Sequence, residues 1–280
     1  MKDIVIDALL DSIKLLPYLF VTFIILEYIE HKLNKKSQNL LIKNKKFGPI
    51  IGGILGGLPQ CGFSSMAASL FSSRVITIGT VVAVFLSTSD EMLPIMISEH
   101  VNILFLFKLI GFKIIIGILI GLIVDLLYRE KDKNVSKNIS EMCDDDHCHC
   151  DEDGILLSSI KHTLKIALFI LIANLLIGFI IYSLGEERLS NLLLDGNILT
   201  YFFASLIGLI PNCASSVIMT ELYLSKLITI GNLISGLLTG SGLGILLLFR
   251  ENKNIKENIS ILSIIYIVGV LVGIIVDCVI

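Results

Sequence analysis

The sequence predicts an all-α polytopic membrane protein made of two inverted repeats of about five segments each. Hydrophobic residues make up 54% of the 280 residues and charged residues 17%, whereas a soluble domain carries about 25% charged residues. The apolar runs from Ile103 to Leu127 and from Ile155 to Leu184 exceed the roughly 20 residues that span a hydrocarbon core. Because both runs are apolar all round, they predict helices and not the alternating strands of a membrane barrel.

The third observation is an internal repeat. The motif G-G-L-P-Q-C-G-F-S-S at 56–65 recurs as G-L-I-P-N-C-A-S-S-V at 208–217, an offset of 152 residues. The repeat divides the chain into a first transmembrane unit at 1–128, a charged linker at 129–153 and a second transmembrane unit at 154–280. At the same offset and without a gap, Cys61 falls on Cys213, Ser64 on Ser216, Thr77-Ile78-Gly79 on Thr229-Ile230-Gly231, Gly117 on Gly269, Gly121 on Gly273 and Asp125 on Asp277.

Loop charges predict that the two units have opposite orientations. The loop 31–46 holds six lysines, while its repeat mate at 185–196 is mostly acidic, and the acidic turn at 98–100 is matched by the basic loop 250–257. Positive charge marks the cytoplasmic side of a membrane protein. We therefore expect a multi-pass protein of the plasma membrane, with the linker 129–153 in the cytosol and both termini outside.

Opposite orientations require an odd number of segments in each unit. The first unit shows four apolar segments, at 4–30, 47–73, 75–97 and 103–128. The count becomes odd if 47–73 is two half-helices folded into a re-entrant hairpin at the P-Q-C turn, since Pro59 lacks an amide proton and interrupts a helix. The matching segment 199–225 would then break at the P-N-C turn, and a single proline-kinked helix is the alternative at both places.

One pair of carboxylates lies within an otherwise apolar segment, in the motif S-T-S-D-E-M-L-P at 87–94. A central aspartate costs about 2.5 to 3.5 kcal/mol to insert, so Asp90 and Glu91 are expected to mark an ion or substrate path that includes Ser89. Oxygen ligands suit hard or borderline divalent cations such as manganese, and the thioether of Met92 disfavours magnesium and calcium. The alternative is that one carboxylate sits at an aqueous mouth and caps the turn before Pro94.

The two proline turns form a second candidate site. If the repeats are symmetric, the turns approach each other at the midplane, where they offer amide oxygens, thiols and hydroxyls to a metal. Free cysteines are also common as small buried hydrophobic residues, which is the alternative for each thiol. Glu221, which matches Ser69, is either a third carboxylate of this site or a residue near the outer face. The candidate ligands are Gln60, Cys61, Asn212 and Cys213, with the hydroxyls of Ser64 and Ser216.

The linker holds a dense set of soft ligands. Cysteine and histidine side chains in this number suit a transition metal, but the set lacks the paired C-x-x-C spacing of a folded zinc site. A flexible sensor or delivery loop is therefore predicted; a merely acidic linker would explain the aspartates but not the soft ligands. The candidate residues are Cys143, His147, Cys148, His149 and Cys150, with Asp144, Asp145 and Asp146.

With these motifs the sequence resembles the family described as manganese transporters or ten-transmembrane heavy-metal (arsenic) exporters. The resemblance extends over almost the whole chain and implies efflux of a heavy metal, with manganese or arsenic as the substrate. It carries over no catalytic residues. The motifs that support it are F-G-P-x-x-G-G at 47–53, P-Q-C-G-F-S at 59–64, S-T-S-D-E-M-L-P at 87–94, H-C-H-C at 147–150 and P-N-C-A-S-S at 211–216.

The resulting prediction is a secondary exporter of a divalent metal and not an enzyme. The sequence has no phosphate-binding loop of the G-x-x-x-x-G-K-[ST] kind, so exchange with protons or other ions is expected to drive transport. The first alternative is efflux of arsenite bound by Cys61 and Cys213. The second is a lipid-phosphate carrier or phosphatase, which needs basic residues in the cavity to bind the phosphate. The candidates for this role are Arg74 and Lys226, both at turns.

The expected partners are the lipid bilayer and the transported metal ion. We expect no tightly bound cofactor, and a net charge of -3 gives no reason to expect nucleic acid. The sequence leaves open whether copies of the chain form a homo-oligomer.

Overall fold

The structure is a computed structural model that describes residues 47–58, 61–88, 92–128, 198–212 and 214–279, with scattered helical residues between 10 and 24 and between 160 and 175. Of Cys61, Pro94 and Ala214 only the backbone is described. Within these ranges the chain forms helices and turns without any strand, in agreement with the predicted all-α class. The linker 129–153 lies outside the described residues.

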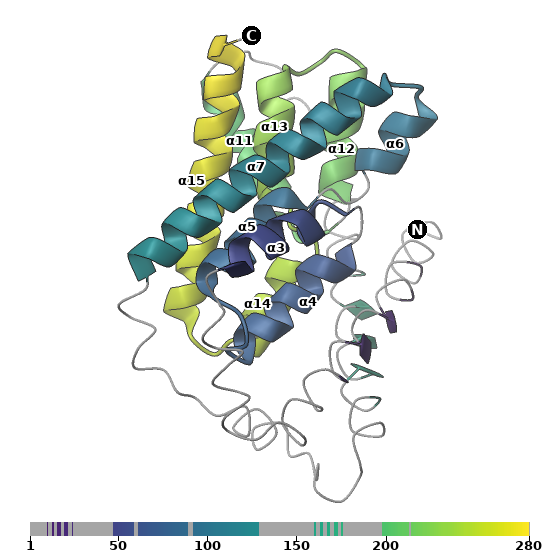
Figure 1. Cartoon of the computed structure of the whole chain (residues 1–280). Coiled ribbons are helices and arrows are strands. Elements are labelled where there is room, and N and C mark those ends of the chain that lie inside the picture. Colours follow the sequence, from purple (N-terminus) through teal and green to yellow (C-terminus); the bar gives the residue numbers. More distant parts are fainter. Residues whose placement is uncertain are drawn as a thin grey trace, which may run out of the picture.

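Both predicted helix breaks at the proline turns are confirmed (Figure 1). In the first unit α3 (Gly48–Gly56) ends before the P-Q-C turn and α4 (Cys61–Ser72) begins after it. In the second unit α11 (Leu199–Gly208) and α12 (Ala214–Leu224) flank the P-N-C turn in the same way.

The apolar segment 75–97, counted once in the sequence, contains two helices. α5 (Ile78–Ser87) ends at a cap residue, Thr88, whose backbone is extended at φ -54° and ψ 131°. The next helix, α6 (Met92–Ser98), begins at Met92. The second unit has a break at the matching place, between α13 (Ile230–Thr239) and α14 (Gly244–Glu251). There the chain turns through Gly242, whose φ of 53° favours glycine. Within its described residues, each unit therefore contains two broken helices.

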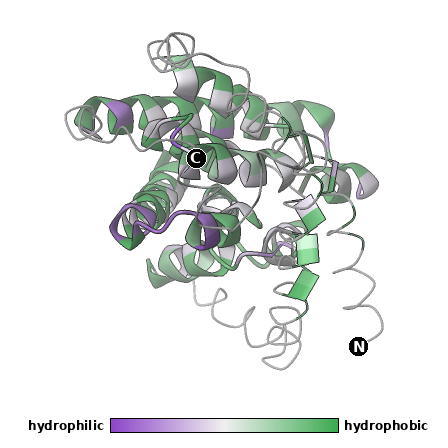
Figure 2. Cartoon of the chain, turned by 90° about the horizontal axis from the view of Figure 1, so that it is seen from below, coloured by the Kyte–Doolittle hydropathy of each residue, from purple (hydrophilic) through white to green (hydrophobic). Residues whose placement is uncertain are grey.

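Each unit closes with a long unbroken helix, α7 (Ile103–Tyr128) or α15 (Ile255–Val279). Both are long and apolar enough to cross a membrane, as is the broken segment from Ile230 to Glu251. Only 22% of the most apolar stretch of α7 is buried within the protein and 39% of that of α15, against 89% for the broken segment. Figure 2 shows hydrophobic residues over most of the described helices. The two long helices thus present apolar side chains outward, as lipid contact requires.

Glycines allow α3, α5 and α7 to pack closely on one another, which gives the motif F-G-P-x-x-G-G a structural role. A Cβ at Gly52 would lie 3.0 Å from Val84 Cγ2 of α5, and one at Gly53 would lie 2.6 Å from Ile118 Cγ1 of α7. On α7 itself, a Cβ at Gly117 would lie 2.7 Å from Ala83 O. The helices therefore meet backbone to backbone, as small residues allow in membranes.

An aspartate from the long helix caps the start of the broken helix in each unit. Asp125 of α7 accepts hydrogen bonds from Thr77 Oγ1 at 2.7 Å and from the amide of Gly79 at 2.8 Å. These donors belong to the first turn of α5, where amides lack helical partners and the helix dipole is positive. The same contacts recur 152 residues later, where Asp277 of α15 accepts from Thr229 Oγ1 and, at 2.8 Å, from the amide of Gly231.

We predict that Gly117→Ala destabilises the protein by about 1–3 kcal/mol, because the new methyl group would overlap Ala83 O. Gly111 on the same helix is the matched control, since a Cβ there meets nothing within 4 Å. Gly111→Ala should be neutral or stabilising by up to about 1 kcal/mol, as alanine favours a helix. Thermal unfolding in detergent measures both; equal midpoints for the two variants would contradict the close packing.

We also predict that Asp125→Asn and Asp277→Asn each lower stability by about 1–3 kcal/mol, because each removes the charge from a hydrogen-bonded helix cap. Glu99→Gln, at an exposed position, should leave the unfolding midpoint unchanged. A wild-type midpoint for either aspartate variant would argue against this role.

Candidate functional site

The two helix breaks of each unit lie next to each other. A Cβ at Gly56, the last residue of α3, would lie 2.6 Å from Val84 O and would overlap Ser87 Oγ at the end of α5. At the matching place, a Cβ at Gly208 would overlap Thr239 Oγ1 at the end of α13. The end of α3 therefore lies beside the end of α5, and the end of α11 beside the end of α13.

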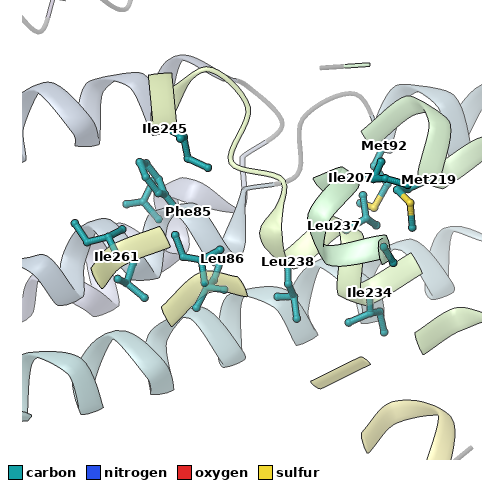
Figure 3. Close-up of a cluster of buried hydrophobic side chains, with 14 of the residues drawn as sticks. Phe85, Leu86, Met92, Ile207, Met219, Ile234, Leu237, Leu238, Ile245 and Ile261 are labelled. Carbon is teal, nitrogen blue, oxygen red and sulfur yellow. The ribbon is translucent and has the colours of Figure 1, made fainter. Parts of the chain in front are cut away.

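The two units also interlock at these breaks. α4 of the first unit packs on α14 of the second, where a Cβ at Gly244 would lie 2.8 Å from both Ser64 Cβ and Phe85 Cε1. α12 of the second unit packs on α6 of the first, and Figure 3 shows Met92 and Met219 beside each other near Leu237. The helix breaks of both units thus surround one central region.

The described candidates lie at different depths. Met92 and Ser64 are fully buried, and Ser216 is 7% exposed. Asn212 is half-buried, and its carbonyl accepts a hydrogen bond from Ser215 Oγ at 2.9 Å, which shapes the start of α12. Glu221 is exposed, beyond the middle of α12.

Several predicted ligands lie outside the described residues. Among the residues that the structure does describe, no group of three or more histidine, cysteine, aspartate and glutamate side chains could hold a metal. Gln60, Ser89, Asp90, Glu91, Cys213, the side chain of Cys61 and the linker residues Cys143, Asp144, Asp145, Asp146, His147, Cys148, His149 and Cys150 fall outside that part.

Buried hydroxyls lie on α4 and in the break after α13. The side-chain oxygens of Ser65 and Ser69 on α4 and of Ser241 in the break after α13 are buried and have no hydrogen-bond partner among the described residues. Ser241 is the repeat mate of Ser89. Buried polar groups are rarely left without a partner, so these hydroxyls are suited to meet a water molecule or a passing solute.

Lys113 is a charged residue that the sequence analysis missed. Its side chain is fully buried in the middle of α7, and its ammonium donates to the carbonyl of Thr88 and, at 2.8 Å, to that of Leu237. These carbonyls lie at the ends of α5 and α13. The spacing could have revealed it, because the residues Lys113, Gly117, Gly121 and Asp125 follow at intervals of four and share one face of α7.

The two turn residues considered for phosphate binding occupy equivalent backbone conformations. Arg74 and Lys226 have φ of 60° and 58°. Arg74 Nη1 forms an ion pair with Glu257 Oε2 at 2.7 Å, which joins the turn after α4 to the start of α15. Arg74 therefore serves a contact between the two units.

Comparison with known proteins gives one family. No curated protein and no solved structure matches the chain. Residues 1–187 match a family described as "Putative, 10TM heavy-metal exporter", which covers the first unit, the linker and the start of the second unit. This range includes the broken helices α3 to α6, the carboxylate pair and Lys113. The chain belongs to this family of ten-helix heavy-metal exporters.

Proposed function

We propose that the chain is a secondary transporter that exports a divalent transition metal, with manganese as the first candidate, through the central region between the helix breaks. The observation that carries the proposal is the pairing of the breaks, where Gly56 lies against the end of α5. Broken helices are tolerated in a membrane where their free backbone groups face a cavity or a ligand. Family membership supports heavy-metal export in general.

The proposed metal ligands come from both turns and from the segment after α5. Asp90 follows Thr88 by two residues, so covalent geometry keeps its Cα within about 7 Å of that of Thr88. Met92 opens α6 and is fully buried. The proposed path comprises Asp90, Glu91 and Met92, the turn residues Gln60, Cys61, Asn212 and Cys213, the hydroxyls of Ser64, Ser89 and Ser216, and Glu221 at its edge.

We further propose that the two units are inverted repeats. Figure 1 supports this, because α7 runs obliquely downward from the α6 side whereas α15 runs upward to the C-terminus. The aspartate caps that recur at an offset of 152 residues support the equivalence of the units. Two inverted units around shared helix breaks would allow the central region to open alternately to either side.

The linker is proposed to capture metal in the cytosol before export. Its cysteine and histidine side chains would bind a transition metal more readily than magnesium or calcium. This role needs no folded site, since the ligands are adjacent in sequence.

The buried Lys113 gives little support to the lipid-phosphate alternative. The ammonium of Lys113 already donates to two backbone carbonyls, and Arg74 is paired with Glu257. A phosphate group would have to displace these partners. The described basic residues therefore give little support to the lipid-phosphate alternative.

We expect Asp90→Ala to reduce manganese export at least roughly tenfold, because it removes a proposed ligand. The test expresses wild type and variant in a manganese-sensitive host and measures cell-associated manganese by mass spectrometry. Glu99→Ala is the control, as Glu99 is an exposed carboxylate at the end of the same segment. Wild-type manganese efflux by Asp90→Ala would contradict the proposed site.

The arsenite alternative is tested with Cys61→Ser/Cys213→Ser under arsenite load. If the proposed function holds, this double variant should lose part of its manganese export but less than Asp90→Ala does, because manganese prefers oxygen to thiol ligands and serine keeps an oxygen at both positions. Cys278→Ser, at an exposed cysteine near the end of α15, controls for general loss of a thiol. Arsenic efflux that is lost with Cys61 and Cys213 but unaffected by Asp90→Ala would favour thiol-based export instead.

A further inference from the structure

The ammonium of Lys113 joins two helix ends from different units. It donates to the carbonyl of Thr88, the cap residue of α5, and to that of Leu237 in the last turn of α13. An uncompensated buried ammonium is strongly unfavourable, so a fully buried lysine requires such partners.

Both carbonyls are available because the helices stop there. In an unbroken helix the amide of Ser241 would donate to Leu237 O, but it donates to Thr239 O at 3.0 Å instead. Thr88 O lies beyond the last residue of α5. The carboxyl end of a helix carries partial negative charge, so two such ends side by side attract a cation.

Three charged residues of the first unit have uncharged mates in the second. At the repeat offset, Lys113 corresponds to Ile265, which is fully buried, and Asp90 and Glu91 correspond to Gly242 and Leu243. The second unit thus supplies a carbonyl of α13 to the cation but no charged side chain at the equivalent positions.

We propose that the meeting point of α5 and α13 is a cation site that the ammonium of Lys113 fills as a tethered ligand. Without the lysine side chain, the site would take a primary alkylammonium ion. Lys113 is therefore a positioning residue, which holds the helix breaks of the two units together beside the metal path. The consequence for transport rests on the proposed function, whereas the cation site itself does not.

The first experiment is chemical rescue of Lys113→Ala in detergent. Alanine retains the Cβ, so n-propylammonium replaces the missing atoms and charge. We expect the variant to lose about 5 °C or more in its unfolding midpoint and to regain part of that with n-propylammonium. Tetramethylammonium, which has no N–H donor, and neutral n-propanol are the controls. Equal effects of all three compounds would overturn the cation site.

Lys113→Met keeps much of the side-chain length without the charge and covers the case in which Lys113→Ala does not fold. We expect it to unfold at a lower temperature than wild type and to gain nothing from n-propylammonium, because methionine occupies the space. A wild-type midpoint for Lys113→Met would show that packing alone matters and would overturn the proposal.

The transport measurement separates this inference from the proposed function. In proteoliposomes loaded with manganese, we expect Lys113→Ala to transport at least tenfold more slowly than wild type and n-propylammonium to restore part of the rate. Transport within twofold of wild type without the amine would overturn the positioning role. If wild type moves no manganese, the proposed function fails, and the thermal rescue still decides whether the cation site exists.

Discussion

The ends of α5 and α13 impose the main physical constraint on this structure, because free helix ends inside an apolar protein must find partners of the right charge. Asp125 and Asp277 accept hydrogen bonds from the amides at the N-termini of α5 and α13. Lys113 donates hydrogen bonds to carbonyls at the C-termini of both helices. On α7, Lys113 and Asp125 are twelve residues apart, about 18 Å along the helix. This spacing lets one lipid-facing helix hold both ends of α5. Charged side chains on a neighbouring helix thus form hydrogen bonds with the backbone groups that a helix break leaves free in the membrane.

Equivalent helices of the two units pack on one another through different residues. In the first, glycines of α3 and α7 bring backbones together around α5. In the second, hydroxyls replace part of that contact, since Ser205 Oγ and Ser235 Oγ lie 2.7 Å apart between α11 and α13, and Thr200 Oγ1 donates to Asn232 Oδ1 at 3.1 Å. Equivalent helices in the two units are therefore held together by different side chains, just as Lys113 of the first unit has an uncharged mate, Ile265, in the second.

Sequence reasoning succeeded where one residue type dictates backbone behaviour. Pro59 and Pro211 marked helix breaks, and the glycines of α7 marked a close helix contact. No such residue marks the end of α5, because hydroxyl side chains are compatible with a helix: Ser87 Oγ and Thr88 Oγ1 both donate back to carbonyls of the preceding turn. Lys113 was missed because one lysine hardly changes the mean hydropathy of a long apolar run. Its role depends on two distant helix ends, which no local pattern contains.

The candidate site could be predicted only in part for a similar reason. The sequence at Asp90, Glu91 and the two proline turns predicts which kinds of ligand are available. Which of these segments lie next to each other depends on contacts between distant parts of the chain. The structure brings Gly56 to Ser87 and Gly208 to Thr239, and it adds the buried hydroxyls of Ser65 and of Ser241, the repeat mate of Ser89.

The interlocking of the units has a consequence for biosynthesis. α4 leaves the ribosome early, yet the surface on which it chiefly packs, α14, is made some 170 residues later. Until then the buried serines of α4 lack the helix that packs on them in the native structure. The first unit must therefore remain in the membrane without its complete packing. Cutting the chain between the units would therefore separate surfaces that complete each other, and neither fragment would contain a finished core.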